Sequence, residues 1–231
     1  MFLEAICDSV SPVRVRYACA MTARRHDQKL AIRMLTPQLW PTLEDLFGEK
    51  GATAGCWCMY WRIGAGYRKQ PADRNRSAFK TVVERGPPPG LLAFEREKAV
   101  GWCQITPRSA LPHLGRVWRL RAGDDVPVWS LSCLYIRIGY RRRGIATALI
   151  EGAVALAFKS GAPAVEAYPI DAELSPSASS TGYVSTFERV GFVRVPSPTR
   201  ERPIMRLTRT KTERAFEASP SASPPPPARN R

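Results

Sequence analysis

The chain has 231 residues, a formal net charge of +15 at pH 7, and 44% hydrophobic residues. No run reaches the roughly 18 consecutive apolar residues of a membrane-spanning helix, and the first thirty residues lack the uninterrupted apolar segment of a signal peptide. These features argue against a membrane protein or an exported one, and they predict a soluble cytoplasmic protein.

Composition divides the chain into three parts. Residues 1–29 show no sustained hydrophobic period and are predicted to be a poorly ordered extension. Residues 210–231 include a Pro/Ser/Ala tract and are predicted to be a disordered basic tail. The remaining residues, 30–209, suffice for one domain with a substantial core.

The six cysteines are too sparse for a disulfide scaffold and come without an export signal, so we expect reduced thiols. Cys56 and Cys58 form a C-x-C pair. A closed zinc site needs four ligands, and no second pair lies at zinc spacing, so no metal is predicted.

Hydrophobic periods and turn residues predict alternating strands and helices along the chain. In chain order, they predict a strand at 29–35, a helix over 36–47 with Thr36 as a possible cap, a helix over 72–86, a hairpin over 90–107, a strand at 127–137, a helix over 144–159, a strand at 164–171, a short helix over 183–190, and strands at 191–195 and 202–208. A helix that connects two strands implies that those strands pair in parallel. The expected fold is therefore an α/β domain with a mixed central sheet flanked by helices.

The junction between the strand at 127–137 and the following helix carries three consecutive arginines and a glycine, Arg141 to Gly144. The first turn of a helix leaves backbone N–H groups without partners, and the helix dipole adds positive charge there. Gly144 lets the backbone approach a ligand closely. The junction is therefore predicted to bind an anion, with phosphate or pyrophosphate as the natural guest.

Two common phosphate-binding motifs are missing: neither G-x-x-x-x-G-K-[ST] nor a strand followed by G-x-G-x-x-G occurs. The segment from Arg141 to Ala146 instead resembles the acetyl-CoA-binding signature [QR]-x-x-G-x-[GA] of the GCN5-related N-acetyltransferases (GNAT). The preceding strand "LYI", the long helix and the later "STFERVGF" stand in the order that this family shows. The resemblance covers roughly Ile32 to Leu207, and it implies a parallel strand pair that splays apart to hold acetyl-CoA.

The resemblance also implies which residues hold acetyl-CoA as co-substrate. Main-chain groups of the strand would bind the pantetheine arm, and the turn would bind the pyrophosphate. These residues are Leu134, Tyr135, Ile136, Arg141, Arg142, Arg143, Gly144, Ile145, Ala146 and Thr147. The family often has a proline where Ile138 stands, which is a small departure at the entry to the turn.

The implied reaction is direct attack of an amine on the thioester carbon, aided by proximity and by a main-chain N–H near Leu134. An amine must first lose a proton, and Glu166 is the first candidate for that base. Many relatives carry a tyrosine in the late helix that protonates the leaving thiolate. That position here is Phe187, so Tyr183, Ser185 or a water would serve instead.

The acceptor side of the family's fold corresponds to residues 55–69, where Trp57, Tyr60 and Trp61 are concentrated. As pocket residues they would suit an acceptor with an apolar or cationic part. The alternative is that they pack the helices onto the sheet.

The leading interpretation is a cytoplasmic acetyl-CoA-dependent N-acetyltransferase that acts on a primary amine of a small molecule or protein. The first alternative is a catalytically inactive CoA-binding protein of the same fold. The second is a basic nucleic-acid-associated protein, against which stands the lack of any helix-turn-helix, zinc-finger or RNA-binding signature. The sequence leaves a homodimer open.

Overall fold

The computed structural model describes residues 30–121, 123–171, 180–198 and 202–210. They form a seven-stranded sheet in the order β1-β2-β3-β4-β5-β7-β6. The strands are β1 Ala31–Met34, β2 Gly90–Glu95, β3 Lys98–Pro107, β4 Val128–Ile136, β5 Ala164–Ala167, β6 Val193–Val195 and β7 Ile204–Thr208. The predicted extension at 1–29 and nearly all of the predicted tail at 210–231 lie outside the described residues.

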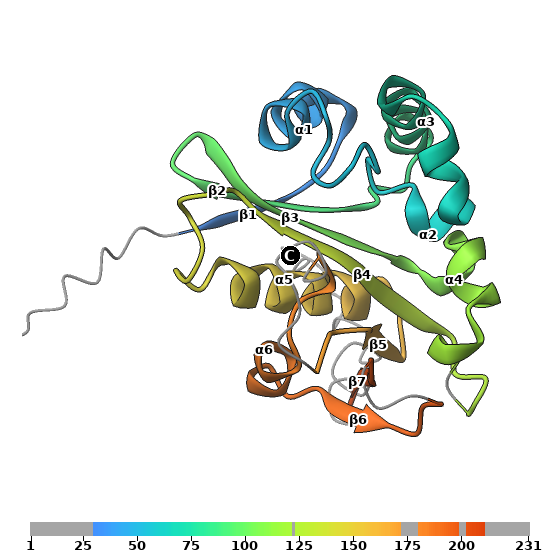
Figure 1. The fold of residues 1–231 in the computed structure, drawn as a ribbon. Coiled ribbons are helices and arrows are strands. Elements are labelled where there is room, and N and C mark those ends of the chain that lie inside the picture. The colour runs from blue at the N-terminus through green and yellow to red at the C-terminus, as the bar shows by residue number, and fades with distance from the viewer. Residues whose placement is uncertain (1–29, 122, 172–179, 199–201, 211–231) are drawn as a thin grey trace, which may run out of the picture.

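Helices cover both faces of the sheet (Figure 1). The helices are α1 Trp40–Phe47, α2 Tyr60–Ile63, α3 Ala72–Arg85, α4 Pro112–Arg116, α5 Ile145–Lys159 and α6 Val184–Arg189. Helices α1 and α3 share one hydrophobic cluster on the upper face in Figure 1, whereas α5 and α6 pack in another cluster on the lower face. Among the described residues, no helix combines the length and apolar character needed to cross a bilayer.

Helix α5 packs against the sheet through Ile145, Leu149 and further buried residues of the same stripe. The close approach depends on Gly101 in β3, where an added Cβ would lie 2.8 Å from Ile145 Cγ2. Helix α5 also connects β4 to β5, which pair in parallel as predicted. The mixed α/β fold expected from the sequence is thus confirmed.

Strands β4 and β5 pair only from Val128 and Ala164 to Leu131 and Ala167. Beyond that point β4 continues to Ile136 beside β3 alone. The β3–β4 register also shifts, because Cys133 pairs with Gln104 while Leu131 pairs with Ile105. Ser132 is therefore the extra residue of a β-bulge, at the point where β4 leaves β5.

Several predicted boundaries differ from the structure. Thr36 makes no side-chain cap, and the helix predicted over 36–47 begins with a 3-10 turn, Pro37–Leu39. The strand predicted at 164–171 ends at Ala167. The sequence analysis predicts no helix at α2 or α4, which have four and five residues. Elements that short do not complete two helical turns, so they produce no readable hydrophobic period.

Candidate active site

The turn from β4 into α5 exposes a run of backbone donors. Gly139, Arg142 and Gly144 have φ values of 87°, 62° and 79°, and such left-handed residues among right-handed ones form concave anion-binding surfaces. Among the described residues, no backbone N–H from Arg141 to Thr147 donates a hydrogen bond to another residue of the chain. The positive end of the 15-residue helix α5 points at the same place.

Side-chain contacts hold the start of this turn at Arg137, and the following residues Arg141 to Arg143 carry positive charge. Arg137 donates to the carbonyl of Ala99 and pairs with Asp45 at 2.5 Å. Arg143 lies 5.0 Å from the centroid of Tyr140, and all three consecutive arginines are exposed. Arg141 to Arg143 therefore form a cationic surface, and the contacts of Arg137 hold the turn that carries it.

The unpaired edge of β4 lies next to this turn. Leu134 is buried, and Tyr135 and Ile136 are half-buried. Across the splay, Gly182 fits closely, because an added Cβ there would lie 3.0 Å from both Leu134 Cδ1 and Phe187 Cε2. The ten residues expected to hold acetyl-CoA thus form one continuous strand-and-turn unit.

Glu166 lies in a buried ion-pair network and is only 1% exposed. Its Oε1 accepts hydrogen bonds from Arg206 Nη2 at 2.7 Å and Nε at 3.1 Å, and its Oε2 accepts from Arg108 Nη1 at 3.1 Å and Tyr168 OH at 3.0 Å. Arg206 also pairs with Asp124 at 2.7 Å and holds the pKa of that carboxyl below its usual value. Both carboxylate oxygens of Glu166 accept hydrogen bonds. Glu166 therefore connects β5 to β7 and to the segment after β3, which is a bracing role.

Desolvation, and then the Glu166 charge, raise the pKa of the Tyr168 phenol. Its hydroxyl lies 2.6 Å from Arg108 Nη1 and 3.0 Å from Ser130 Oγ. Tyr168 is fully buried, so it belongs to the same structural network.

Tyr183 and Phe187 occupy opposite environments on α6. Phe187 is fully buried and packs on Phe192 with ring centroids 5.2 Å apart. Tyr183 is the N-terminal capping residue of α6, is 44% exposed, and forms a bridge with Ile170. Because Tyr183 follows Gly182, it stands beside the segment that faces Leu134.

Trp57 and Trp61 are both buried, at 1% and 5% exposure. Trp57 packs against Trp40 and Phe47 with centroids 6.0 and 5.5 Å apart. Trp61 donates its Nε1 hydrogen to the carbonyl of the bulge residue Ser132 at 2.8 Å. Trp57 therefore packs between the helices and the sheet, which was the alternative to a role in a pocket. Trp61 instead braces the bulge.

Tyr60 is half-buried and lies at the centre of an aromatic group. Its ring lies 4.6 Å from Trp61, 5.9 Å from Tyr67 and 5.2 Å from His113, measured between centroids. Through Tyr67 this group reaches an open cavity of about 690 Å³.

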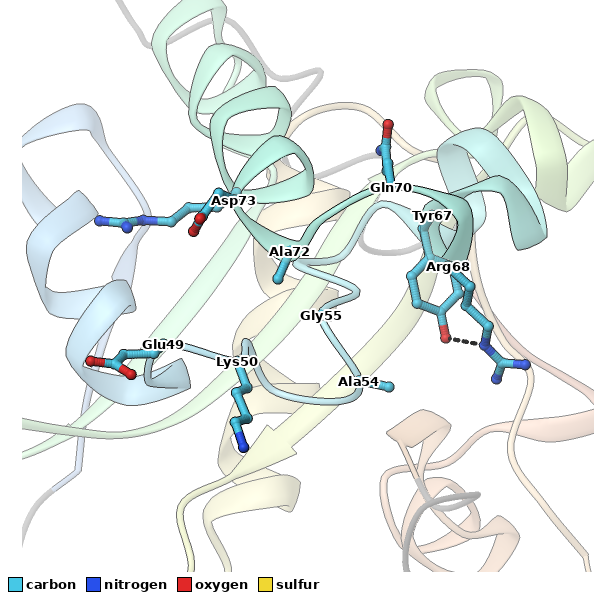
Figure 2. Close-up of a pocket in the computed structure, with 10 residues that line it drawn as sticks. Glu49, Lys50, Ala54, Gly55, Tyr67, Arg68, Gln70, Ala72 and Asp73 are labelled. Atoms are coloured by element: carbon cyan, nitrogen blue, oxygen red, sulfur yellow. Dashed lines mark hydrogen bonds between the residues drawn. The ribbon is translucent and has the colours of Figure 1, made fainter.

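That cavity lies between the loop after α1 and the start of α3 (Figure 2). Its walls carry charges of both signs. The lining residues are Glu49, Lys50, Ala54, Gly55, Tyr67, Arg68, Gln70, Ala72, Asp73 and Arg76. Figure 2 shows Arg68 hydrogen-bonded to the Tyr67 hydroxyl, at 2.9 Å, across from Lys50. The sequence analysis placed the acceptor side at residues 55–69, which include Gly55, Tyr67 and Arg68 of this lining. It missed the charged residues outside that range, because isolated polar residues on loops carry no period.

The model of the acetyltransferase (GNAT) family matches residues 53–180, more than half of the 231-residue chain. The chain belongs to the GNAT acetyltransferase family. Acetyl-CoA is the co-substrate of this family, as expected from the Arg141–Ala146 motif.

Solved GNAT structures resemble the chain at low identity. The PaiA N-acetyltransferase of Thermoplasma acidophilum, in complex with coenzyme A, is 16% identical, with a TM-score of 0.48 over 78% of this chain and 99% of that one. A polyamine N-acetyltransferase of Drosophila melanogaster, which forms N-acetylagmatine, is 14% identical, with a TM-score of 0.47 over 78% of this chain and 100% of that one. No curated protein matches the sequence.

Proposed function

We propose that the protein is an acetyl-CoA-dependent N-acetyltransferase that modifies a primary amine of a small molecule or a protein. The observation that carries this proposal is the run of unpartnered N–H groups from Arg141 to Thr147 directly after the unpaired edge of β4. The pyrophosphate of CoA needs a cationic turn, and the pantetheine arm attached to it needs an open strand edge next to that turn.

In the proposed complex, the N–H groups of the turn hold the pyrophosphate and the edge at Leu134 to Ile136 holds the pantetheine arm. The thioester then lies by the bulge at Ser132. A preorganised main-chain N–H polarises a carbonyl without the cost of reorganising solvent. The amine nitrogen bonds to the thioester carbon and the C–S bond breaks, so CoA leaves as a thiolate.

Two protons must move. We propose Tyr183 as the donor to the thiolate, because this exposed residue directly follows Gly182, which lies next to Leu134. We assign no base role to Glu166, since both its oxygens are held by Arg206, Arg108 and Tyr168. The acceptor ammonium therefore loses its proton to solvent before attack.

We propose that the acceptor enters by the cavity of Figure 2 and passes Tyr60 and Trp61. The lining carries both charges: Glu49 and Asp73 are acidic, and Lys50, Arg68 and Arg76 are basic. Such walls suit an acceptor that carries an anionic group beside its amine better than a polycation. We assign Trp57 a packing role and no contact with the acceptor.

The test is thiol release from acetyl-CoA by the full chain with single amines: an amino acid, a peptide with a free N-terminus, and a polyamine. The expected result is amine-dependent thiol release, with one acetyl group added to the amine by mass. Binding of acetyl-CoA without release for any amine would instead support a second candidate, a CoA-binding protein without catalysis. Buried Phe187 and braced Glu166 are the observations that favour that candidate.

We further propose that residues 30–209 are the acetyltransferase domain and that the protein acts in the cytoplasm. Cell fractionation tests the location. Light scattering on the purified chain tests for the homodimer.

A further inference from the structure

The C-x-C pair, which the transferase reaction does not use, lies against the cofactor strand. Cys58 and Cys133, a residue of β4 that follows the bulge, pack in the same hydrophobic cluster, and the neighbouring Cys133 thiol raises the pKa of Cys58. Cys58 Sγ accepts the Trp102 Nε1 hydrogen at 3.2 Å. Two thiols far apart in sequence therefore meet on the face of the sheet that α1 and α3 cover.

The chain around Cys58 is strained in a way that its neighbours hold in place. Ala54, Trp57 and Cys58 have φ values of 45°, 45° and 57° although none is glycine. Such conformations are unfavourable for residues other than glycine and occur preferentially at functional sites. Residues 51–59 contain no helix or strand, and turn hydrogen bonds such as Cys56 N–H to the Thr53 carbonyl fix their conformation.

We propose that Cys58 and Cys133 are a redox pair that forms a reversible disulfide in the presence of a hydroperoxide. Cys133, which is half-buried, reacts first. Its thiolate attacks a peroxide oxygen, the O–O bond breaks, and a sulfenic acid and one water (or alcohol) form. The Cys58 sulfur then attacks the Cys133 sulfur, hydroxide leaves and takes up the Cys58 proton as water, and the S–S bond forms.

The order of events follows from the environments of the two thiols. The neighbouring Cys133 thiol, and then burial, raise the pKa of Cys58 well above its ordinary value. Cys58 is 6% exposed, so it stays protonated and shielded until Cys133 is oxidised beside it. A fixed neighbouring thiol captures a sulfenic acid before further oxidation.

The other described cysteines make hydrogen bonds of their own. Cys56 Sγ accepts the Tyr60 N–H at 3.4 Å, and burial, followed by the nearby Cys133 thiol, raises the pKa of the Cys56 thiol to about 11. Cys103 is fully buried and donates to the Leu149 carbonyl at 3.7 Å, on the α5 side. No group of three or more His, Cys, Asp or Glu that could hold a metal ion occurs among the described residues.

The experiment uses the full chain with Cys7→Ser and Cys19→Ser, treated with hydrogen peroxide, alkylated, and digested with trypsin without reduction. Cleavage at Lys50, Arg62, Arg121 and Arg137 puts Cys56 and Cys58 in peptide 51–62 and Cys133 in peptide 122–137. The expected product is one linked species of these two peptides, which dithiothreitol separates.

Single substitutions identify the partner. Cys56→Ser should keep the linked species, and Cys133→Ser should abolish it and leave Cys58 alkylated. Cys58→Ser should abolish the link and leave Cys133 over-oxidised. A link that survives Cys58→Ser, or peroxide-treated protein that shows only alkylated cysteines, would overturn the proposal. Circular dichroism verifies that each variant is folded, and because Cys133→Ser tests the pair from the other side, the result does not depend on Cys58→Ser folding.

A second readout rests on the proposed function. The disulfide would fix the acceptor-side segment to β4, so thiol release from acetyl-CoA should fall at least tenfold on oxidation and return on reduction. The peptide map needs no activity, so a chain that forms the link but never acetylates would refute only the transferase assignment.

Discussion

Gly144 and Gly139 offer a matched pair of substitutions in the β4–α5 turn. Both are exposed, both have positive φ (79° and 87°), and an added Cβ meets nothing within 4 Å at either position. Leucine at either site should therefore cost about 1–2 kcal/mol in unfolding free energy, because L-residues resist the left-handed conformation. For a chain of this size, that is a fall in Tm of roughly 2–8 °C.

The two variants should differ in CoA binding. Gly144→Leu places a side chain within the run of N–H groups from Arg141 to Thr147, whereas Gly139 lies before that run. Losing one or two charge-assisted hydrogen bonds costs about 1.5–3 kcal/mol each, so we expect CoA to bind Gly144→Leu about 100-fold more weakly. Gly139→Leu should bind within about threefold of the wild type.

Isothermal titration with CoA measures the affinities, and scanning calorimetry measures the stabilities. Equal loss of CoA affinity in both folded variants, or none in Gly144→Leu, would refute the assignment of this turn to the pyrophosphate. Unequal losses of Tm would instead refute the strain argument.

Three further predictions concern charge and proton transfer. Glu166→Gln leaves the guanidinium groups of Arg206 and Arg108 without a buried counter-charge, and should lower the unfolding free energy by about 3–5 kcal/mol in urea titrations; a loss under 1 kcal/mol would contradict the bracing role. Tyr183→Phe should keep stability within about 0.5 kcal/mol because the residue is a surface one, yet lower kcat at least tenfold with unchanged CoA affinity; an unchanged kcat would remove Tyr183 from the mechanism. Because Arg206 lowers the pKa of Asp124 below 3.8, Asp124 contributes stability above that pH and loses it as pH falls through the folded-state pKa. The stability difference between wild type and Asp124→Asn, followed by acid titration of circular dichroism, should therefore shrink below about pH 3.8, and a constant difference would contradict the ion pair.

The sequence predicts the fold well where long periods exist. The alternation around Leu131 and the Ala/Leu/Ile pattern of 144–159 identify β4 and α5, and the crossover rule then requires the parallel pair. The residues Arg141–Ala146 identify the turn that we propose binds pyrophosphate, because turn geometry follows from local residue types. Loops and short helices, such as α2 and α4, give no such signal.

Roles that depend on tertiary neighbours could not be predicted. Glu166 looks like an available carboxylate in the sequence, but its partners Arg108 and Arg206 lie 58 and 40 residues away. Trp57 and Trp61 are alike in sequence, whereas one packs in a cluster and the other braces the bulge. No local pattern encodes such long-range partners.

The short pairing of β4 with β5 also bears on how the molecule opens. Four residue pairs, Val128–Ala164 to Leu131–Ala167, join the half-sheet β1–β4 to the half-sheet of β5, β6 and β7. One hydrophobic cluster, with helix α5 at its centre, also connects the two half-sheets. A ligand in the splay would act as a missing strand and add a second connection between them. At a ligand concentration 100 times its Kd, this ligand would add about 2.7 kcal/mol to the unfolding free energy.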